Sequence, residues 1–196
     1  MYEVVLASQS VGRKWIFELL GLPFKVIPSG IDENAFSGLP PHRLVEELSL
    51  AKAREVASEM RDRKRLVVGA DTVVVTNDGE IMGKPADERE AREMLLQLQG
   101  RSHYVMSGVA VVLSDTMEFR VAHDKTEVKM RRISPEIIEG YIRSGEPLGK
   151  AGAYAIQGKG ALLVEGICGC YFNVVGLPLA KFAELTQDLG IDLMDL

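Results

Sequence analysis

The sequence predicts an α/β protein in which a mixed central sheet is flanked by helices. Apolar strand-like runs alternate along the chain with segments whose apolar residues recur at helical spacing. Of the 196 residues, 46% are hydrophobic and 26% are charged, which is typical of globular rather than disordered proteins. Because no repeat, low-complexity tract or linker interrupts the chain, we expect one domain over residues 1–196, with any two lobes continuous with each other.

The first third of the chain carries signals for two strands and two helices. Residues 3–7 are predicted to form a short strand, and Ser10 can cap the helix that follows. Gly21 ends this helix, since glycine readily takes the left-handed conformation found after a helix. Residues 24–28 are predicted to form a second strand, and residues 41–60 a long helix.

A hairpin and a third helix are predicted next. Residues 66–75 and 80–83 are expected to pair around Asn77–Gly79, because an Asp-Gly dipeptide favours a tight hairpin turn. Asp87 can cap a helix whose apolar residues recur at helical spacing until Gly100 ends it.

The last part of the chain adds long strands and two more helices. Residues 103–113 and 117–130 are predicted to be strands, and Ser134–Glu136 begins a helix in the usual order of cap and then proline. Residues 151–176 are rich in glycine and are predicted to be strand-like. Residues 177–189 are predicted to form the last helix.

Charge and composition argue against several classes of function. The net charge of −5 gives no reason to expect nucleic acid or an anionic membrane surface as a partner. We find no apolar stretch of the roughly 20 residues that a membrane helix requires, and no basic leader of a signal peptide. Cys168 and Cys170 are too few for a zinc site and lack C-x-x-C spacing, so we interpret them as buried, inert thiols of a cytoplasmic protein.

Asp71 is the strongest candidate for chemistry, because it interrupts a run of valines that should be buried on both faces. An unpaired buried charge is costly. If the hairpin folds as predicted, Lys84 lands across from Thr72 or Val73, within one residue of facing Asp71. The two could form a structural ion pair, but buried ion pairs rarely repay their desolvation. We therefore favour a carboxylate that holds a divalent cation against phosphate oxygens.

Basic groups in two other segments could bind phosphate. In LASQSVGRK, residues 6–14, a helix N-terminus is joined by donors from Ser8, Ser10 and Arg13, a composition that suits a triphosphate. A plain capped helix explains the same residues. Lys52 shares a helix face with apolar residues, and there it could reach phosphate or simply extend past its neighbours to solvent.

The glycine-rich segment at residues 149–178 could approach a ligand closely, and Gln157 offers both a donor and an acceptor to the edge of a base. A tightly turned sheet edge is the alternative. The segment matches neither a P-loop nor G-x-G-x-x-G. The three histidines are scattered and show no metal-ligand spacing, so we do not expect a histidine base.

Taken together and in this order, these segments resemble the Maf family of nucleoside triphosphate pyrophosphatases. The combination of GADTVV with AGAYAIQG is specific, and the second motif resembles the branch of the family that acts on dTTP and UTP. The matching motifs span nearly the whole chain: LASQS-x-x-R, Ile31-Asp32-Glu33, LAKAR around Lys52, GADTVV, GKP, SGV, DKTEV, AGAYAIQGKGALLVE and VVGLPL.

The resemblance implies a Maf/ITPase-like fold of two lobes around a deep cleft, and a homodimer as in many members. It also implies hydrolysis of dTTP, UTP or modified pyrimidine nucleotides to the monophosphate and pyrophosphate, which cleans the nucleotide pool. By position, Asp71 would be the catalytic acid and, with Glu33, a ligand of Mg²⁺ or Mn²⁺. The remaining implied site residues are Arg13, Lys52 and Lys84 at the phosphates and Ser8, Gly12, Thr72 and Gln157 at the substrate.

Two positions depart from the family pattern. Ser10-Val11-Gly12-Arg13 stands where S-P-R-R is usual, so Gly12 replaces one of two arginines at a position linked to substrate choice. Gly149 replaces the acid that usually precedes K-A-G-A-Y, and another basic residue such as Lys14 could compensate for a lost phosphate contact.

The predicted mechanism is metal-assisted hydrolysis at the α-phosphorus, in which Asp71 holds the cation and accepts a proton from the attacking water. The basic residues would neutralise the triphosphate as pyrophosphate leaves. The alternative is a non-catalytic nucleotide sensor that acts on cell division and septum formation through a protein partner. The absent arginine at Gly12 keeps that alternative open, because binding could persist without turnover.

Overall fold

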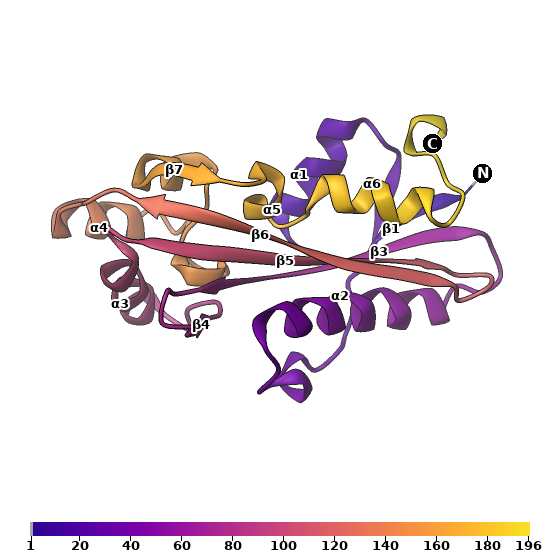
Figure 1. Cartoon of the computed structure of the whole chain (residues 1–196), viewed down its shortest axis with the longest axis horizontal. Coiled ribbons are helices and arrows are strands. Elements are labelled where there is room, and N and C mark those ends of the chain that lie inside the picture. The colour runs from indigo at the N-terminus through magenta and orange to yellow at the C-terminus, as the bar shows by residue number, and fades with distance from the viewer. Residues whose placement is uncertain (1) are drawn as a thin grey trace. The chain divides into compact units, whose positions relative to one another are not determined.

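The structure is a computed structural model that describes residues 2–196. Strands and helices alternate along the chain, as the sequence predicts (Figure 1). The strands are β1 Glu3–Leu6, β2 Phe24–Val26, β3 Arg65–Val75, β4 Ile81–Met82, β5 Ser102–Leu113, β6 Phe119–Met130 and β7 Val164–Cys168. The α-helices are α1 Val11–Leu20, α2 Pro41–Ser58, α3 Glu88–Leu98, α4 Pro135–Ile142, α5 Tyr171–Val175 and α6 Leu179–Gln187. The 3₁₀ helices are η1 Glu33–Phe36, η2 Ala151–Ala153, η3 Gly158–Leu163 and η4 Leu193–Asp195.

The strands of the described chain form one mixed sheet in the order β2-β1-β3-β5-β6-β7, with β4 beside β3. β1 runs parallel to both β2 and β3, whereas β4 is antiparallel to β3 and β7 is antiparallel to β6. The predicted α/β class with a mixed central sheet flanked by helices is therefore confirmed. None of the helices within residues 2–196 combines the length and the apolar character needed to cross a bilayer.

The chain divides into two compact units. Unit 1 contains the chain up to Asp71 together with Ser107–Asp124 and Gly176–Leu196. Unit 2 contains Thr72–Met106 and Lys125–Val175. The long strands β3, β5 and β6 contribute residues to both units, so the chain passes between them within strands. That the two units make a single domain stays a prediction.

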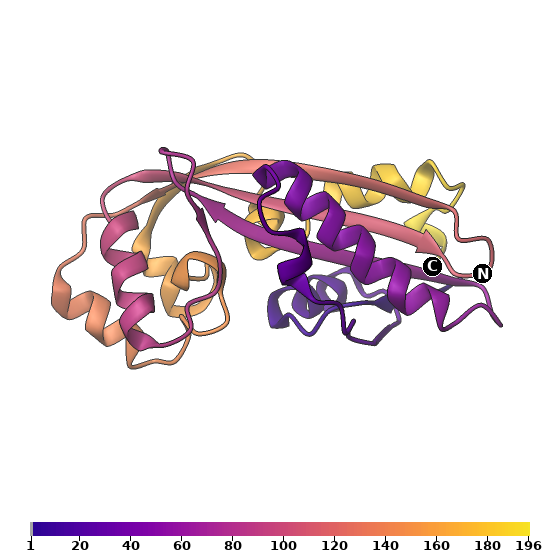
Figure 2. The ribbon, with the colours of Figure 1, turned by 90° about the horizontal axis from the view of Figure 1, so that it is seen from below.

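Unit 1 packs helices on both faces of its strands. α2 covers one face, and α1 and α6 cover the other (Figures 1 and 2). The rings of Phe17 in α1 and Phe182 in α6 lie 5.7 Å apart. The buried cluster beneath α2 joins that helix to β1, β3 and β5 and consists of Val5, Ala7, Leu50, Ala53, Val56, Ala57, Val67, Ala110 and Val112.

Two glycines let α2 lie directly against the sheet. A Cβ at Gly69 of β3 would stand 2.1 Å from the carbonyl oxygen of Ser49 in α2. A Cβ at Gly108 of β5 would stand 2.1 Å from the carbonyl oxygen of Val45, one turn earlier in the same helix. Both contacts are with helix backbone, which cannot rotate away, so only glycine fits at either position without displacing α2.

We predict that Gly69→Ala lowers the free energy of unfolding by about 1–3 kcal/mol, because the added methyl group must push α2 off β3. Urea unfolding followed by circular dichroism measures the change. Gly166→Ala is the matched control, since Gly166 also lies in a strand but a Cβ there would meet nothing within 4 Å. Equal stability of the two variants would contradict the proposed close contact.

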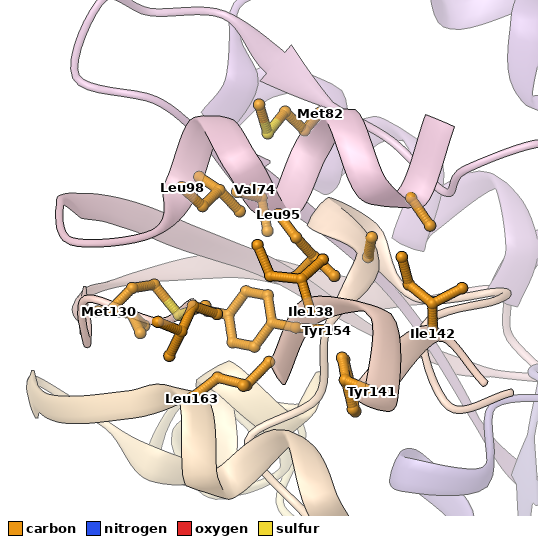
Figure 3. Close-up of a cluster of buried hydrophobic side chains, with 14 of the residues drawn as sticks. Val74, Met82, Leu95, Leu98, Met130, Ile138, Tyr141, Ile142, Tyr154 and Leu163 are labelled. Atoms are coloured by element: carbon orange, nitrogen blue, oxygen red, sulfur yellow. The ribbon is translucent and has the colours of Figure 1, made fainter. Parts of the chain in front are cut away.

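Unit 2 has its own apolar core (Figure 3), in which side chains of α3 and α4 meet the segment that carries Tyr154. Leu95 and Leu98 come from α3, and Ile138 and Ile142 come from α4. Since α3 begins at the side-chain cap Asp87 and its apolar residues follow helical spacing, local signals and the tertiary core agree here.

His103 is fully buried in unit 2 and pairs with Tyr154. Its Nε2 lies 2.8 Å from the Tyr154 hydroxyl, and its Nδ1 has no hydrogen-bond partner within the described part of the chain. Burial lowers the pKa of His103 from 6.5 to about 4 and raises the pKa of the Tyr154 hydroxyl. Both side chains are therefore neutral in the folded protein near pH 7.

His103 should make the fold sensitive to acid. Below pH 6.5 the unfolded chain protonates this histidine while the folded chain resists until about pH 4, so stability falls across that interval by about 3 kcal/mol. We predict that His103→Gln, which keeps a hydrogen-bonding side chain but does not titrate, loses less stability between pH 7 and pH 4. Urea midpoints at the two pH values test this, and parallel losses in both proteins would rule it out.

The prediction for residues 151–176 is wrong in most of its length. Only β7 is a strand there, and the rest consists of η2, η3, α5 and turns. The backbone of Gly152, Ala153 and Gly158 takes positive φ angles, which extended strands do not allow. The abundant glycine in this segment therefore signals tight turns rather than a sheet.

The interpretation of the two cysteines as buried thiols is also wrong. Cys168 is exposed and Cys170 is half-buried, and both are free thiols. β7 ends at Cys168, and Gly169 turns the chain with a φ of 128°, so Cys170 lies outside the strand.

Candidate active site

The N-terminal turn of unit 1 is built by two serines. Ser10 caps α1, and its side chain accepts a hydrogen bond from the backbone N–H of Arg13 at 3.4 Å. The Ser8 hydroxyl accepts the N–H of Ser10 at 3.2 Å. Gly12, which is half-buried, lies in the first turn of α1 directly before Arg13. The cap predicted from the sequence is thus confirmed, and it fixes the turn from which Arg13 extends.

Arg13 is buried, with 8% of its surface exposed, although it lies in the first turn of a helix. Its Nε donates to the Gly176 carbonyl at 2.8 Å, and its terminal nitrogen donates to the Ser8 hydroxyl at 3.1 Å. Burial lowers the pKa of the guanidinium, while the negative charges of Asp71 and Glu33 act in the opposite direction. Arg13 therefore belongs to the same electrostatic cluster as these two carboxylates.

Lys52 joins the two carboxylates. Its Nζ lies 2.7 Å from Asp71 Oδ1 and 2.6 Å from Glu33 Oε1. The side chains of Lys52 and Asp71 are 9% and 12% exposed, whereas that of Glu33 is 47% exposed. Lys52 and Asp71 thus form a buried ion pair, and Glu33 brings a second negative charge to it from the solvent side.

The positions of these groups follow from local structure. Asp32 caps η1 by accepting the N–H of Asn34 at 3.0 Å, which places Glu33 at the first residue of that helix. Lys52 lies on the buried face of α2, as its spacing from apolar residues suggests. Asp71 is two residues beyond Gly69, the glycine on which α2 rests, and therefore lies on the same face of β3. The close packing of α2 on β3 brings the two charges together.

The two carboxylates of unit 1, Asp71 and Glu33, fit a divalent cation that takes its other ligands from water and substrate. No group of three or more His, Cys, Asp or Glu side chains in residues 2–196 could hold a metal ion by itself. Mg²⁺, however, is commonly bound by one or two carboxylates together with waters and substrate phosphates. Asp71 and Glu33 provide two carboxylates near one ammonium group, and a carboxylate has enough lone pairs to bond Lys52 and a cation at once.

Three other predicted site residues belong to unit 2. Thr72 is half-buried in β3, Lys84 is exposed, and Gln157 is half-buried directly before η3. The β3–β4 hairpin pairs Val74 with Met82 and Val75 with Ile81, and β4 ends at Met82. A position of Lys84 opposite Thr72 or Val73 therefore stays a prediction.

A backbone hydrogen bond links the segments that carry Lys84 and Gln157. The N–H of Gly152 donates to the Gly83 carbonyl at 3.0 Å, which ties η2 to the residue before Lys84. A Cβ at Gly152 would stand 2.8 Å from a Val74 methyl group, so η2 also rests against β3.

The ion partner of Asp71 differs from the one that the sequence suggests. The predicted hairpin favours Lys84 for that role, whereas the structure pairs Asp71 with Lys52. Two features of the sequence could have indicated this pair. Lys52 shares a helix face with apolar residues, and Gly69 marks the strand face that a helix approaches. The Gly176 carbonyl that holds Arg13 was also missed, although Gly176 lies in the VVGLPL motif.

We predict that Lys52→Met lowers the free energy of unfolding by about 3–5 kcal/mol, since it leaves Asp71 as an uncompensated buried charge. Adding Asp71→Asn to this variant should recover part of the loss. Urea unfolding of both proteins measures the effect. Lys181→Met is the control, because Lys181 pairs with Glu184 at the surface and should change stability by less than about 0.5 kcal/mol. A Lys52→Met variant as stable as this control would contradict the buried ion pair.

Comparison with known protein sequences gives matches over nearly the full chain. A family model described as "Maf-like protein" matches residues 3–189. A dTTP/UTP pyrophosphatase from Pelotomaculum thermopropionicum is 47% identical, over 99% of this chain and 100% of that protein. A dTTP/UTP pyrophosphatase from Moorella thermoacetica is 51% identical, over 98% of this chain and 97% of that protein. Among solved structures, a HAM1 protein from Coxiella burnetii gives a TM-score of 0.47 at 20% identity and covers 68% of this chain and 75% of its own.

Proposed function

This chain belongs to the Maf-like protein family, and from that premise we propose that it is a nucleoside triphosphate pyrophosphatase that hydrolyses dTTP and UTP. The resemblance noted in the sequence is thereby confirmed at the level of the family. The observation that carries the proposal is the name shared by full-length relatives at about half identity, dTTP/UTP pyrophosphatase. The cluster of buried Arg13, Lys52 and Asp71 with the exposed Glu33 supports it, because this cluster has the charges that triphosphate hydrolysis requires.

The proposed reaction is attack of water on the α-phosphorus. A new P–O bond forms to the water oxygen, the bond from the α-phosphorus to the bridging oxygen breaks, and that oxygen leaves with pyrophosphate. Asp71 accepts the proton that the water loses. Arg13, Lys52 and Lys84 neutralise the negative charge that moves onto the leaving pyrophosphate. The product besides pyrophosphate is the nucleoside monophosphate.

Asp71 and Glu33 are the residues that would hold a divalent cation, Mg²⁺ or Mn²⁺. When bound, such a cation supplies positive charge to the phosphate oxygens and makes an attacking water more acidic. Lys52 holds one oxygen of each carboxylate, so it orients both groups before any substrate arrives. Arg13 is held in the same way by Ser8 and by the Gly176 carbonyl. These contacts preorganise the proposed phosphate site.

Base selection is assigned to a second set of residues. Gln157 and Thr72 would bind the pyrimidine, Gln157 because its amide can both donate and accept a hydrogen bond. Ser8 and Gly12 would contribute at the N-terminal turn. With glycine rather than arginine at position 12, the turn has no side chain there, which is compatible with modified pyrimidine nucleotides as additional substrates. A homodimer, a single domain with a cleft between two lobes, and a cytoplasmic location stay predictions.

We predict that Asp71→Asn lowers kcat by at least about 10³-fold, since it removes the proposed proton acceptor and one charge at the metal. Release of pyrophosphate from dTTP with Mg²⁺ measures the effect. Asp188→Asn is the control, because Asp188 is exposed at the end of α6 and should keep wild-type activity. Retained activity in Asp71→Asn would refute the catalytic role.

A panel of nucleoside triphosphates with Mg²⁺ tests the function itself. Release of pyrophosphate from dTTP and UTP, stopped by EDTA, supports the pyrophosphatase. Release of inorganic phosphate in the first turnover would instead identify a different phosphohydrolase. Saturable binding of nucleotide without any product would support the nucleotide sensor that the substitution at Gly12 left open.

A further inference from the structure

The backbone around Gln157 is folded into a closed turn of unit 2. Residues 155–160 double back so that a Cβ at Gly160 would stand 2.1 Å from the Ala155 carbonyl oxygen. The two ends of the turn therefore touch, and Gln157 lies between them. Gly158 follows with a φ of 63°, a conformation that side chains rarely adopt.

Two side chains from α4 and the turn after it hold the two ends of this loop. The hydroxyl of Tyr141, in α4, accepts the N–H of Ala155 at 3.2 Å. Glu146, four residues after the last residue of α4, accepts the N–H of Lys159 on one carboxylate oxygen and the N–H of Gly160 on the other, both at 3.1 Å. Gln157 lies two residues after Ala155 and two residues before Lys159, so the anchored amides stand on both sides of it.

Glu146 is the stronger of the two anchors. Hydrogen bonds to an ionised carboxylate are roughly twice as strong as those between neutral groups, and here both oxygens are used. Gly158 also leaves just enough room for this carboxylate, because a Cβ at position 158 would stand 2.9 Å from its Oε1. The Tyr141 hydroxyl has its pKa raised to about 12 by burial, so it stays neutral.

Glu146 is itself held in place. Its N–H donates to the Ser144 hydroxyl at 3.3 Å, and that hydroxyl donates to the Tyr141 carbonyl at 2.6 Å. The end of α4 and the 155–160 turn are thus joined by a short chain of hydrogen bonds that begins and ends at Tyr141. Such a chain restricts the backbone on both sides of Gln157.

We propose that Glu146 is a positioning residue for base recognition, which clamps the 155–160 turn so that Gln157 is presented to the nucleotide in one fixed conformation. The inference rests on the assignment of Gln157 to the base in the proposed function. It adds a residue that is not expected to touch substrate, and it explains why an acidic side chain precedes the glycine-rich segment.

Binding of nucleotide measures the effect without requiring turnover. We predict that Glu146→Ala weakens binding of the α,β-imido analogue of dTTP by about tenfold and reduces its preference over the dCTP analogue, as titration calorimetry with Mg²⁺ would measure. Glu146→Gln, which keeps one acceptor oxygen, should lie between Ala and the wild type. Glu165→Ala is the matched control, since Glu165 pairs with Lys129 at the surface of the same unit and should bind as the wild type does.

Amide hydrogen exchange separates positioning from general destabilisation. In Glu146→Ala the amides of Lys159 and Gly160 should exchange at least about tenfold faster, while core amides of α3 stay as slow as in the wild type. Unchanged exchange at these two amides, or unchanged affinity and preference despite faster exchange, would overturn the inference. These outcomes are independent of pyrophosphate release, so a wild-type protein that binds both analogues but releases no pyrophosphate would refute the proposed function and leave this inference standing.

Discussion

The ion pair between Lys52 and Asp71 is the interaction on which the charged cluster of unit 1 depends. A lone carboxylate inside a strand of valines would be strongly unfavourable, and the ammonium 2.7 Å away compensates its charge. The pair exists because α2 lies directly on β3, and α2 can do so because position 69 has no side chain. A backbone feature with no chemistry of its own thus determines where the charged groups lie.

The other two charged residues of the cluster, Arg13 and Glu33, are held in place by neighbouring groups. Arg13 is held by a serine and a backbone carbonyl, and Glu33 is placed by the cap of a short 3₁₀ helix. In unit 2 the backbone beside the proposed base contact is also held by a fixed partner. There the carboxylate of Glu146 accepts hydrogen bonds from backbone N–H groups beside Gln157. In both units residues assigned to the substrate, or the backbone beside them, are held by hydrogen bonds or ion pairs to their neighbours, which is the usual condition for a preorganised site.

Much of the fold could be predicted from sequence because its local signals agree with its tertiary packing. The caps Ser10 and Asp87 and the stop at Gly21 are observed where the sequence places them, and the long helix and strands follow their apolar periodicity. Residues 151–176 could not be predicted in this way. Their turns depend on positive φ angles and on acceptors from α4 and the turn after it, neither of which leaves a periodic pattern in the sequence. The same limit applies to the site. Asp71 stands out among valines, but its partner Lys52 is 19 residues away and is recognised only once α2 rests on β3.

The contact of α2 with the sheet also bears on how this chain can vary. At Gly69 and Gly108 the carbonyl oxygens of α2 lie where a methyl group would be, so any other amino acid must displace this helix. The same limit therefore applies to natural variation and to designed libraries. The surrounding apolar residues can be substituted together if their total volume is kept, whereas Gly69 and Gly108 should stay glycine. To widen the substrate range, the turns that carry the proposed substrate residues should be varied, and the contact between α2 and the sheet should be kept.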